Sequence, residues 1–274
     1  MFSFSQVLLE KKRPLVMGIL NITPDSFLDG GENNCLSSAL ERLVLLQEQG
    51  ADIIDIGACS TAPCNELASC EEELSRLKSV LPELMRVAKL PVSIDTFRAE
   101  IAEYALSQGV SVVNDESGCF NDAMASAVER YGAGWIFMHT GGSDSRSSVK
   151  YENGVVADVK CFFADVRKRA LYNGISMEQL AFDVGIGFGK TRTDDLQLLN
   201  SLSMLSEYQP LLVGVSAKRV VGEATGRDKK ERQFGSVAAG AVAIYNGAQI
   251  LRVHDVAGTL DAIKMTVAIK KESL

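Results

Sequence analysis

Polar and charged side chains stand at the ends of the short apolar runs of this sequence or directly behind them. A guanidinium can grip phosphate oxygens with two parallel hydrogen bonds, whereas a lysine acts as a mobile point charge. Carboxylates beside an amide suit a ligand rich in N–H donors, such as an aminopyrimidine ring. Together these residues would form a site with a heteroaromatic half and an anion half; structural ion pairs among the same groups are the alternative. The set is Asn21, Asp55, Asp95, Asn114, Asp183, Lys218, Arg252 and His254.

Eight apolar runs with strand character alternate with longer helical stretches. The expected strands are 15–20, 52–56, 92–94, 110–113, 135–138, 179–182, 211–215 and 250–253. The clearest helices are 38–49, 71–88, 99–106, 155–172 and 234–246, where apolar residues recur at helical spacing. Apolar strands separated by helices predict a parallel sheet that is buried on both faces. We therefore predict an α/β fold, a (β/α)8 TIM barrel with a single domain over 1–274 and an N-terminal extension over 1–13; an open doubly wound sheet is the alternative.

In a barrel, the residues behind all eight strands meet at one rim, and enzymes of this fold carry their catalytic residues there. A single polar residue after a strand is ordinarily a turn or helix-cap residue. Here the pattern recurs after every strand, with His139 behind the fifth and Ser216 behind the seventh. The cations follow the seventh and eighth strands, where barrels frequently bind phosphate. We therefore expect the rim to carry the function.

The overall charge argues against some classes of partner. The net charge is −7 and the pI is about 5.1, whereas nucleic-acid binding needs a basic face. No apolar run reaches the roughly 18 residues of a membrane span, and the first residues carry their charges in the reverse order of a secretory signal. We expect a cytoplasmic protein with neither nucleic-acid nor membrane partners. The six cysteines are interpreted as reduced thiols, with a soft-metal or redox site at Cys59, Cys64 and Cys70 as the alternative.

The glycine-rich segment 185–191 comes close to two nucleotide-binding motifs. The phosphate-binding loop G-x-x-x-x-G-K-[ST] needs glycine at the position of Val184, and G-x-G-x-x-G needs glycine at the position of Lys190. The sequence therefore predicts neither an ATPase nor a dinucleotide enzyme.

Five motifs, in order along the chain, resemble those of the dihydropteroate synthases, and the resemblance runs from near Pro14 to the C-terminus. The motifs are Asn21-Ile-Thr-Pro-Asp-Ser-Phe27, Val92-Ser-Ile-Asp-Thr96, Val113-Asn-Asp115 with Gly118, Phe182-Asp183 through Gly185-Ile-Gly-Phe-Gly-Lys-Thr191, and Leu251-Arg-Val-His-Asp-Val256. The resemblance implies a pterin-binding barrel and a transferase of folate biosynthesis. Such an enzyme condenses 6-hydroxymethyl-7,8-dihydropterin pyrophosphate with p-aminobenzoate to give 7,8-dihydropteroate and pyrophosphate.

The resemblance also implies a role for each matching residue. Asp95, Asn114 and Asp183 would hold the pterin ring, with Lys218 beside it. Asn21, Arg252 and His254 would take the pyrophosphate, with Mg²⁺ as cofactor and Asn21 as its ligand, and Phe188 would lie beside the aminobenzoate path. A homodimer is expected. The complete expected substrate-binding set is Asn21, Asp55, Thr61, Asp95, Asn114, Asp183, Phe188, Lys218, Arg219, Arg252 and His254, and the expected catalytic residues are Asp95, Lys218, Arg252 and His254.

Three segments depart from the family's usual motifs, and all lie on the aminobenzoate side. Ala62 and Ala217 stand where arginines are usual, Arg219 stands where a small residue should meet aminobenzoate, and Thr140-Gly-Gly replaces a Met-x-Gly pattern. We hypothesise that Arg219 takes over part of the lost anion contact; the alternative is that it points into solvent from the first turn of a helix. Two other functions stay open: a non-catalytic paralogue that binds a pterin, and a pterin-dependent methyltransferase with a cobalamin partner.

Overall fold

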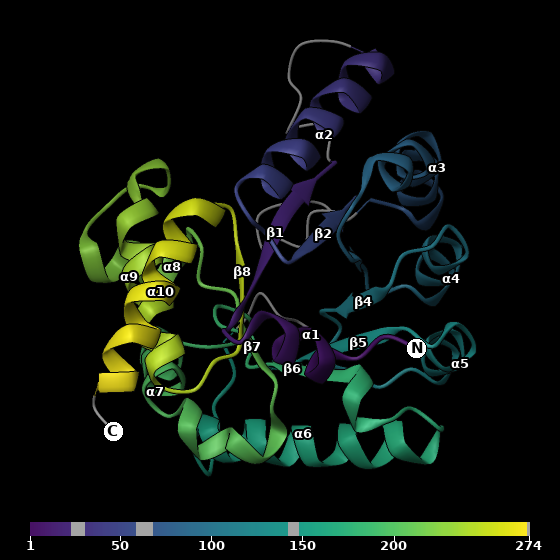
Figure 1. The fold of residues 1–274 in the computed structure, drawn as a ribbon. Helices are drawn as coiled ribbons and strands as arrows, with labels where there is room; N and C mark the ends of the chain where they lie inside the picture. The colour runs from purple at the N-terminus through teal and green to yellow at the C-terminus, as the bar shows by residue number, and fades with distance from the viewer. Residues whose placement is uncertain (23–30, 59–67, 142–147, 273–274) are drawn as a thin grey trace.

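Eight parallel strands close into a barrel in the order in which they follow one another along the chain (Figure 1). The structure is a computed structural model that describes residues 1–22, 31–58, 68–141 and 148–272, the side chains of 31–35 excepted. The predicted barrel is confirmed, and the open sheet is wrong because β1 pairs with β8. The strands are β1 (Leu15–Asn21), β2 (Ile53–Gly57), β3 (Val92–Asp95), β4 (Val112–Asp115), β5 (Gly134–Met138), β6 (Leu180–Asp183), β7 (Leu211–Val213) and β8 (Ile250–Val253).

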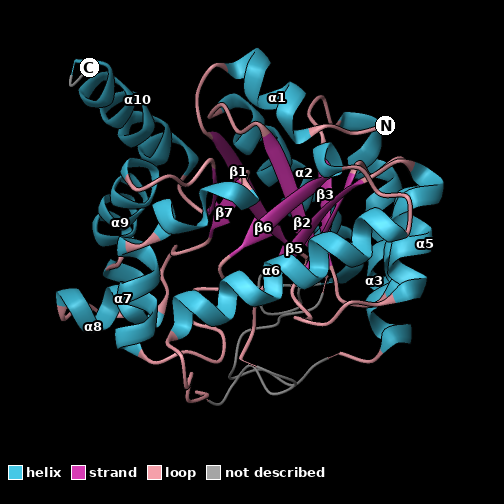
Figure 2. Cartoon of the chain, turned by 90° about the horizontal axis from the view of Figure 1, so that it is seen from below, coloured by secondary structure: helices cyan, strands magenta, loops and turns pink. Residues whose placement is uncertain are grey.

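Helices connect the strands and surround them (Figure 2). The predicted helices agree with the structure to within one residue, except that the helix expected at 38–49 already begins at Gly31. In the described ranges, the 3₁₀ segments Met177–Gln179, Leu202–Tyr208 and Lys229–Glu231 lie in the connections. The α-helices are α1 (Phe4–Lys11), α2 (Gly31–Glu48), α3 (Cys70–Val87), α4 (Ala99–Ser107), α5 (Asp122–Tyr131), α6 (Val155–Tyr172), α7 (Arg192–Asn200), α8 (Arg219–Thr225), α9 (Gln233–Tyr245) and α10 (Val256–Glu272).

The segment 1–13, which the sequence indicated only as an extension, forms the helix α1. Ser3 caps it, because the Ser3 side chain accepts a hydrogen bond from the backbone N–H of Gln6 at 3.1 Å. Phe4 is fully buried against apolar residues near the first positions of the strands, among them Leu15, Ile53 and Ile250. The helix therefore closes the barrel at the end opposite the predicted rim.

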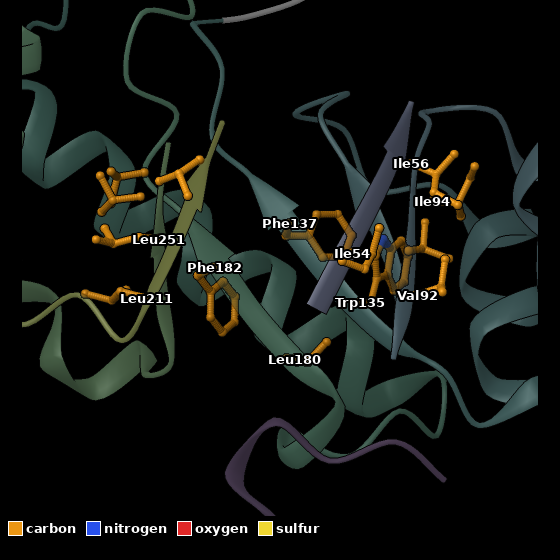
Figure 3. Close-up of a cluster of buried hydrophobic side chains, with 14 of the residues drawn as sticks. Ile54, Ile56, Val92, Ile94, Trp135, Phe137, Leu180, Phe182, Leu211 and Leu251 are labelled. Carbon is orange, nitrogen blue, oxygen red and sulfur yellow. The ribbon is translucent and has the colours of Figure 1, made fainter. Parts of the chain in front are cut away.

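Side chains alternate across the barrel wall, as they must in any strand. One set points outward and packs beneath the helices; Figure 3 shows Ile54, Ile56, Trp135 and Phe182 in this layer. The intervening side chains point inward, so Ile53 packs in the barrel interior with Phe4. This alternation decides which polar residues at the strand ends face the interior.

Several strands extend further than the apolar runs suggested. The ladder continues through the pairs Gly57 with Asp95, Asp95 with Asn114, and Met138 with Asp183. The predicted strands ended just before the polar residues Asp95, Asn114 and Asp183. In the structure the strand pairing continues through these polar residues, which form the next layer of side chains in the barrel interior. The seventh strand was predicted too long, since pairing stops at Val213.

None of the helices in the described ranges is long and apolar enough to cross a membrane. Cys70, Cys119 and Cys161 are free thiols. Cys59 and Cys64, on which the alternative soft-metal site depended, lie outside the described residues.

Candidate active site

Four of the predicted site residues lie one layer above the apolar floor of the barrel interior. Asp55 follows Ile53 by two positions, and the same spacing separates Arg252 from Ile250. Because side chains repeat with a period of two along a strand, each polar residue points inward directly above its apolar predecessor. The same relation holds for Asn114 above Val112 and Asp183 above Ala181.

Arg252 is the centre of the cluster, and a different carboxylate contacts each of its three guanidinium nitrogens. Its Nε donates to Asp55 Oδ2 at 2.6 Å, and its Nη2 donates to Asp95 Oδ2. Its Nη1 lies 3.5 Å from Glu116 Oε1. Burial opposes the charge on Arg252, but Asp95, Asp55 and Glu116 outweigh this effect and raise its pKa above the ordinary value. The guanidinium is therefore charged and fixed between the two halves of the predicted site.

Several buried oxygen atoms around Arg252 have no hydrogen-bond partner within the described ranges. Asn114 donates through Nδ2 to Asp55 Oδ2 at 3.2 Å, which leaves Asn114 Oδ1 unpaired. Asp55 Oδ1, Asp95 Oδ1 and Ser93 Oγ are unpaired as well. Buried polar atoms are nearly always satisfied in folded proteins, so a group of acceptors in one place indicates a ligand that supplies N–H or O–H donors.

Asp183 and Lys218 extend the cluster, because both interact electrostatically with Arg252 and Glu116. Asp183 Oδ1 accepts a hydrogen bond from the backbone N–H of Gly185 at 2.8 Å. Lys218 Nζ donates to the carbonyl of Ile186 at 2.6 Å and lies 4.6 Å from the centre of the Phe188 ring. The cation therefore rests on the face of the Phe188 ring, and Asp183 lies close enough to act on its charge.

Burial shifts the pKa values of the pocket toward the neutral forms. It raises the pKa of Asp95, an effect that Glu116 reinforces and Arg252 opposes. It raises the pKa of Asp183, with Lys218 opposing, and lowers the pKa of Lys218, with Asp183 opposing. Burial thus opposes the charged form of each group, and a ligand that pairs with the charged form would offset this cost.

The predicted anion half lies beside Arg252 at the ends of β1 and β8. His254 Nδ1 is 3.0 Å from Ser216 Oγ, and the His254 carbonyl accepts from Arg42 at 2.7 Å. Desolvation, then the charge of Arg252, lowers the pKa of His254 to about 4, so the imidazole is neutral at pH 7. Asn21 ends β1 with an exposed side chain. A Cβ atom at Gly57 would come within 3.5 Å of Asn21 Oδ1 and 3.6 Å of Asp95 Oδ2, so glycine leaves room between them.

His139 does not belong to this pocket, although the sequence indicated both histidines at the rim. It has the same strand parity as Phe137, which packs in the outer layer. Its Nε2 lies 2.8 Å from Asp158 Oδ1, and its ring meets Phe162 of α6 edge-on. Burial lowers the pKa of His139 to about 4. The expected rim position of His139 is wrong because side chains alternate along the strand, so the residue after Met138 points outward.

Arg219 begins α8 and is engaged by the protein itself. Its Nη1 donates to Glu223 at 3.1 Å, and its Nη2 donates to the carbonyl of Lys190 at 3.0 Å and lies 3.9 Å from Asp195. The side chain is half exposed. It therefore neither simply points into solvent nor lies free for a ligand; it holds the segment that carries Phe188. Thr61 and Ala62, the other predicted elements of this side, lie outside the described residues.

Three residues of the site escaped the sequence analysis: Ser93, Glu116 and Lys190. Lys190 is 3% exposed, and its Nζ donates to the carbonyls of His139 and Phe188, both at 3.0 Å. Burial lowers the pKa of Lys190 to about 8. It fixes the backbone of the Phe188 segment. Ser93 was detectable, because it stands two residues before Asp95 on the same strand face.

The family model and the sequence relatives of this chain indicate one and the same protein family. The family model for pterin binding enzymes matches residues 17–254. The chain is 40% identical to the dihydropteroate synthase of Synechocystis sp. over 94% of this chain and 91% of that protein, and 35% identical to that of Escherichia coli K12 over 95% and 93%.

Solved structures agree with the sequence relatives. The Clostridium difficile dihydropteroate synthase in the presence of pteroic acid superposes with a TM-score of 0.89 at 38% identity, covering 94% of this chain and 97% of that one. The Xanthomonas albilineans dihydropteroate synthase with 4-aminobenzoic acid gives a TM-score of 0.88 at 40% identity, covering 94% and 93%. The predicted resemblance is confirmed: this chain belongs to the dihydropteroate synthase family of pterin-binding transferases.

Proposed function

We propose that the chain catalyses the family's reaction in folate biosynthesis, the condensation of 6-hydroxymethyl-7,8-dihydropterin pyrophosphate with p-aminobenzoate, at the carboxyl ends of its barrel strands. The observation that carries the proposal is the group of unpaired buried acceptors beside two cations. Asp95, Asn114 and Asp183 present oxygen atoms that match the N–H donors of the pterin ring. Arg252 and Lys218 supply the positive charge that a pyrophosphate-bearing substrate needs.

The chemistry needs no covalent nucleophile. If pyrophosphate departs first, a cationic pterin methylene remains for the arylamine to attack. Arg252 would stabilise the negative charge on the leaving group, and the carboxylates of Asp95 and Asp183 would stabilise the cationic ring. Neutral His254, which Ser216 orients, would donate a hydrogen bond to the pyrophosphate. Holding the two substrates against each other supplies the remaining acceleration.

The expected Mg²⁺ would be held mainly by the substrate. Among the residues that the structure describes, no group of three or more His, Cys, Asp or Glu side chains could hold a metal. The amide oxygen of Asn21 is a hard donor of the kind that Mg²⁺ accepts, and Mg²⁺ ordinarily combines one or two protein ligands with phosphate oxygens and water. A bound Mg²⁺ would neutralise charge on the departing pyrophosphate. Asn21→Ala should then lower the affinity for pyrophosphate in the presence of Mg²⁺ and leave it unchanged in EDTA.

On the aminobenzoate side, the proposal places the arylamine near Phe188 and the carboxylate toward Arg219 and Thr61. Arg219 Nη1 and Nη2 are already committed to Glu223 and to the carbonyl of Lys190. Contact with aminobenzoate would therefore require Arg219 to exchange its exposed partner Glu223, while the Lys190 contact keeps the side chain beside the Phe188 segment.

We also propose that two copies associate through α9 and α10, which pack against each other. Val242 and Tyr245 of α9 and Met265 of α10 are 52%, 54% and 62% exposed. Apolar side chains of this size on adjacent helices favour burial against a second copy. Light scattering should give the dimer mass for the wild-type protein, and the double variant Val242→Glu with Met265→Glu should give the monomer mass. A monomeric wild type would reject this proposal. The proposed location is the cytoplasm, which cell fractionation would test.

One assay tests the activity and separates the alternatives. The purified protein is mixed with pterin pyrophosphate, p-aminobenzoate and Mg²⁺, and both pyrophosphate release and the pteroate product are measured. Equal amounts of both products support the synthase. Pterin binding without turnover would identify a non-catalytic paralogue, and methyl transfer from a methylated pterin to cobalamin would identify a methyltransferase.

A further inference from the structure

Glu116 lies in the pocket but has no role in the function proposed above. It follows the last residue of β4, and its side chain is 5% exposed. Its Oε1 is 3.5 Å from Arg252 Nη1. Its negative charge also acts on Asp95 and Asp183, whose pKa values it raises after the larger effect of burial. Glu116 therefore faces the same interior as the residues assigned to the pterin ring.

The three carboxylate contacts of Arg252 are unequal. Asp55 binds Nε at 2.6 Å, and Asp95 binds Nη2 at hydrogen-bond distance. The 3.5 Å separation between Nη1 and Glu116 exceeds the usual range of about 2.7–3.2 Å for an N–H···O hydrogen bond. The Glu116 contact is thus an ion pair without a close hydrogen bond, and Nη1 is the edge of the guanidinium that can most readily change its partner.

The charges of the pocket make this exchange consequential. Asp55, Asp95, Glu116 and Asp183 are carboxylates, whereas Arg252, Lys218 and, near Asp183, Lys190 are the cations. The pyrophosphate group must enter a pocket that already contains more acids than bases. A carboxylate on Nη1 both occupies the donor that the anion needs and repels the anion.

We propose that Glu116 is a positioning residue that holds the Nη1 edge of Arg252 in the substrate-free protein and competes with pyrophosphate for it. Glu116 thereby weakens the binding of pyrophosphate and favours its release as a product, while Asp55 and Asp95 keep the guanidinium in place. This inference rests on the assignment of Arg252 to the pyrophosphate in the proposed function.

Calorimetric titration with inorganic pyrophosphate and Mg²⁺ tests the inference. Glu116→Gln removes the charge and keeps the shape, and it should bind pyrophosphate about tenfold more tightly. A like charge at roughly 6 Å corresponds to about threefold in water and about a hundredfold at the effective dielectric constant of a protein surface, which brackets this value. Affinity for a phosphate-free pterin should stay within about twofold. In turnover, the inhibition constant of pyrophosphate and the KM for pterin pyrophosphate should fall together.

Three further variants make the result interpretable. Glu116→Asp keeps the charge and should bind pyrophosphate like the wild type. Glu103→Gln removes an exposed charge on α4, where Glu103 pairs with Arg130, and should change nothing. If Glu116→Gln does not fold, Glu116→Ala replaces it with the same expected gain in pyrophosphate affinity.

Arg252→Ala separates this inference from the proposed function on which it rests. If Arg252→Ala binds pyrophosphate as well as the wild type, the assignment of Arg252 to the anion is wrong. If Arg252→Ala loses pyrophosphate affinity while Glu116→Gln shows unchanged or weaker binding, the assignment stands and the competition by Glu116 is overturned. The competition is also overturned if Glu116→Gln loses affinity for phosphate-free pterin by as large a factor as its affinity for pyrophosphate changes. Glu116 would then support the whole site.

Discussion

Replacing Asp95 with asparagine is expected to stabilise the unliganded protein and to weaken pterin binding. Asp95 is 6% exposed; its Oδ2 accepts from Arg252, and its Oδ1 has no partner in the described part of the chain. Burial, then Glu116, raises the pKa of Asp95 well above 3.8. Ionised Asp95 therefore lowers the free energy of unfolding at neutral pH, and the amide removes that charge with almost the same shape.

The structure sets the magnitude of both effects. Arg252 keeps Asp55 and Glu116 in the Asp95→Asn variant, so no buried cation is left unpaired. We expect the free energy of unfolding to rise by about 1 kcal/mol, a usual gain when a destabilised binding site is relaxed. Loss of a charged acceptor for the ring donors costs about 1.5–3 kcal/mol, which corresponds to roughly a ten- to hundredfold higher Kd for pterin.

Urea denaturation and calorimetric titration with a phosphate-free pterin measure the two effects. Because the folded-state pKa of Asp95 is raised, the cost of its ionisation is absent below pH 3.8 and complete above the folded-state pKa. The stability advantage of Asp95→Asn should therefore disappear as the pH is lowered. Asp165→Asn, an exposed change of equal charge on α6, should alter neither quantity. A less stable Asp95→Asn protein with unchanged pterin affinity would refute the reasoning.

Three other variants probe the rest of the site. Arg252→Ala should weaken pyrophosphate-bearing pterin by roughly a hundredfold and phosphate-free pterin by less, since it removes a charged donor to the anion; equal losses in calorimetry would make Arg252 structural. Arg219→Ser should raise the KM for p-aminobenzoate about ten- to hundredfold, and Ala62→Arg in that variant should recover much of the loss; an unaltered KM would restrict Arg219 to holding its neighbours. The depressed pKa of His139 contributes stability that is complete above pH 6.5 and lost as the pH falls through about 4. The free energy of unfolding of the wild type relative to His139→Gln should therefore fall by up to about 3 kcal/mol between pH 7 and pH 4, as measured by urea denaturation. A difference between the two proteins that is the same at both pH values would contradict this.

The sequence predicted the closed barrel and the convergence of its carboxylates because both depend on local patterns. The strands β2, β4, β6 and β8 each supply an apolar residue and, two positions later, a polar one, as with Ile53 and Asp55. Alternation then determines that these polar side chains meet in the interior. The same rule would have excluded His139, which shares its parity with outward-facing Phe137. A position at a strand end does not by itself place a side chain in the interior, because the face of the strand decides its direction.

Other features depend on contacts between distant segments, which no local pattern encodes. Four of the eight residues of the helix α1 are apolar, but only the end of the barrel opposite the rim explains why Phe4 is fully buried. Glu116 resembles any acidic loop residue until the fold places it beside Arg252, 136 positions further along the chain. The commitment of Arg219 to Lys190 likewise requires the geometry of two loops.

The sharing of atoms around Arg252 determines how the two halves of the site can be coupled. The Oδ2 atoms of Asp55 and Asp95 each accept a hydrogen bond from the guanidinium, whereas their Oδ1 atoms have no partner in the described ranges. A pterin ring can therefore pair with the Oδ1 atoms without displacing Arg252, since one carboxylate accepts at both oxygens. Pyrophosphate instead needs a guanidinium nitrogen, and Nη1 is the one whose present partner is least closely bound. The two halves are thus joined through the guanidinium but need not compete for the same oxygen atoms, so an exchange at Glu116 should alter pyrophosphate affinity with little effect on the ring.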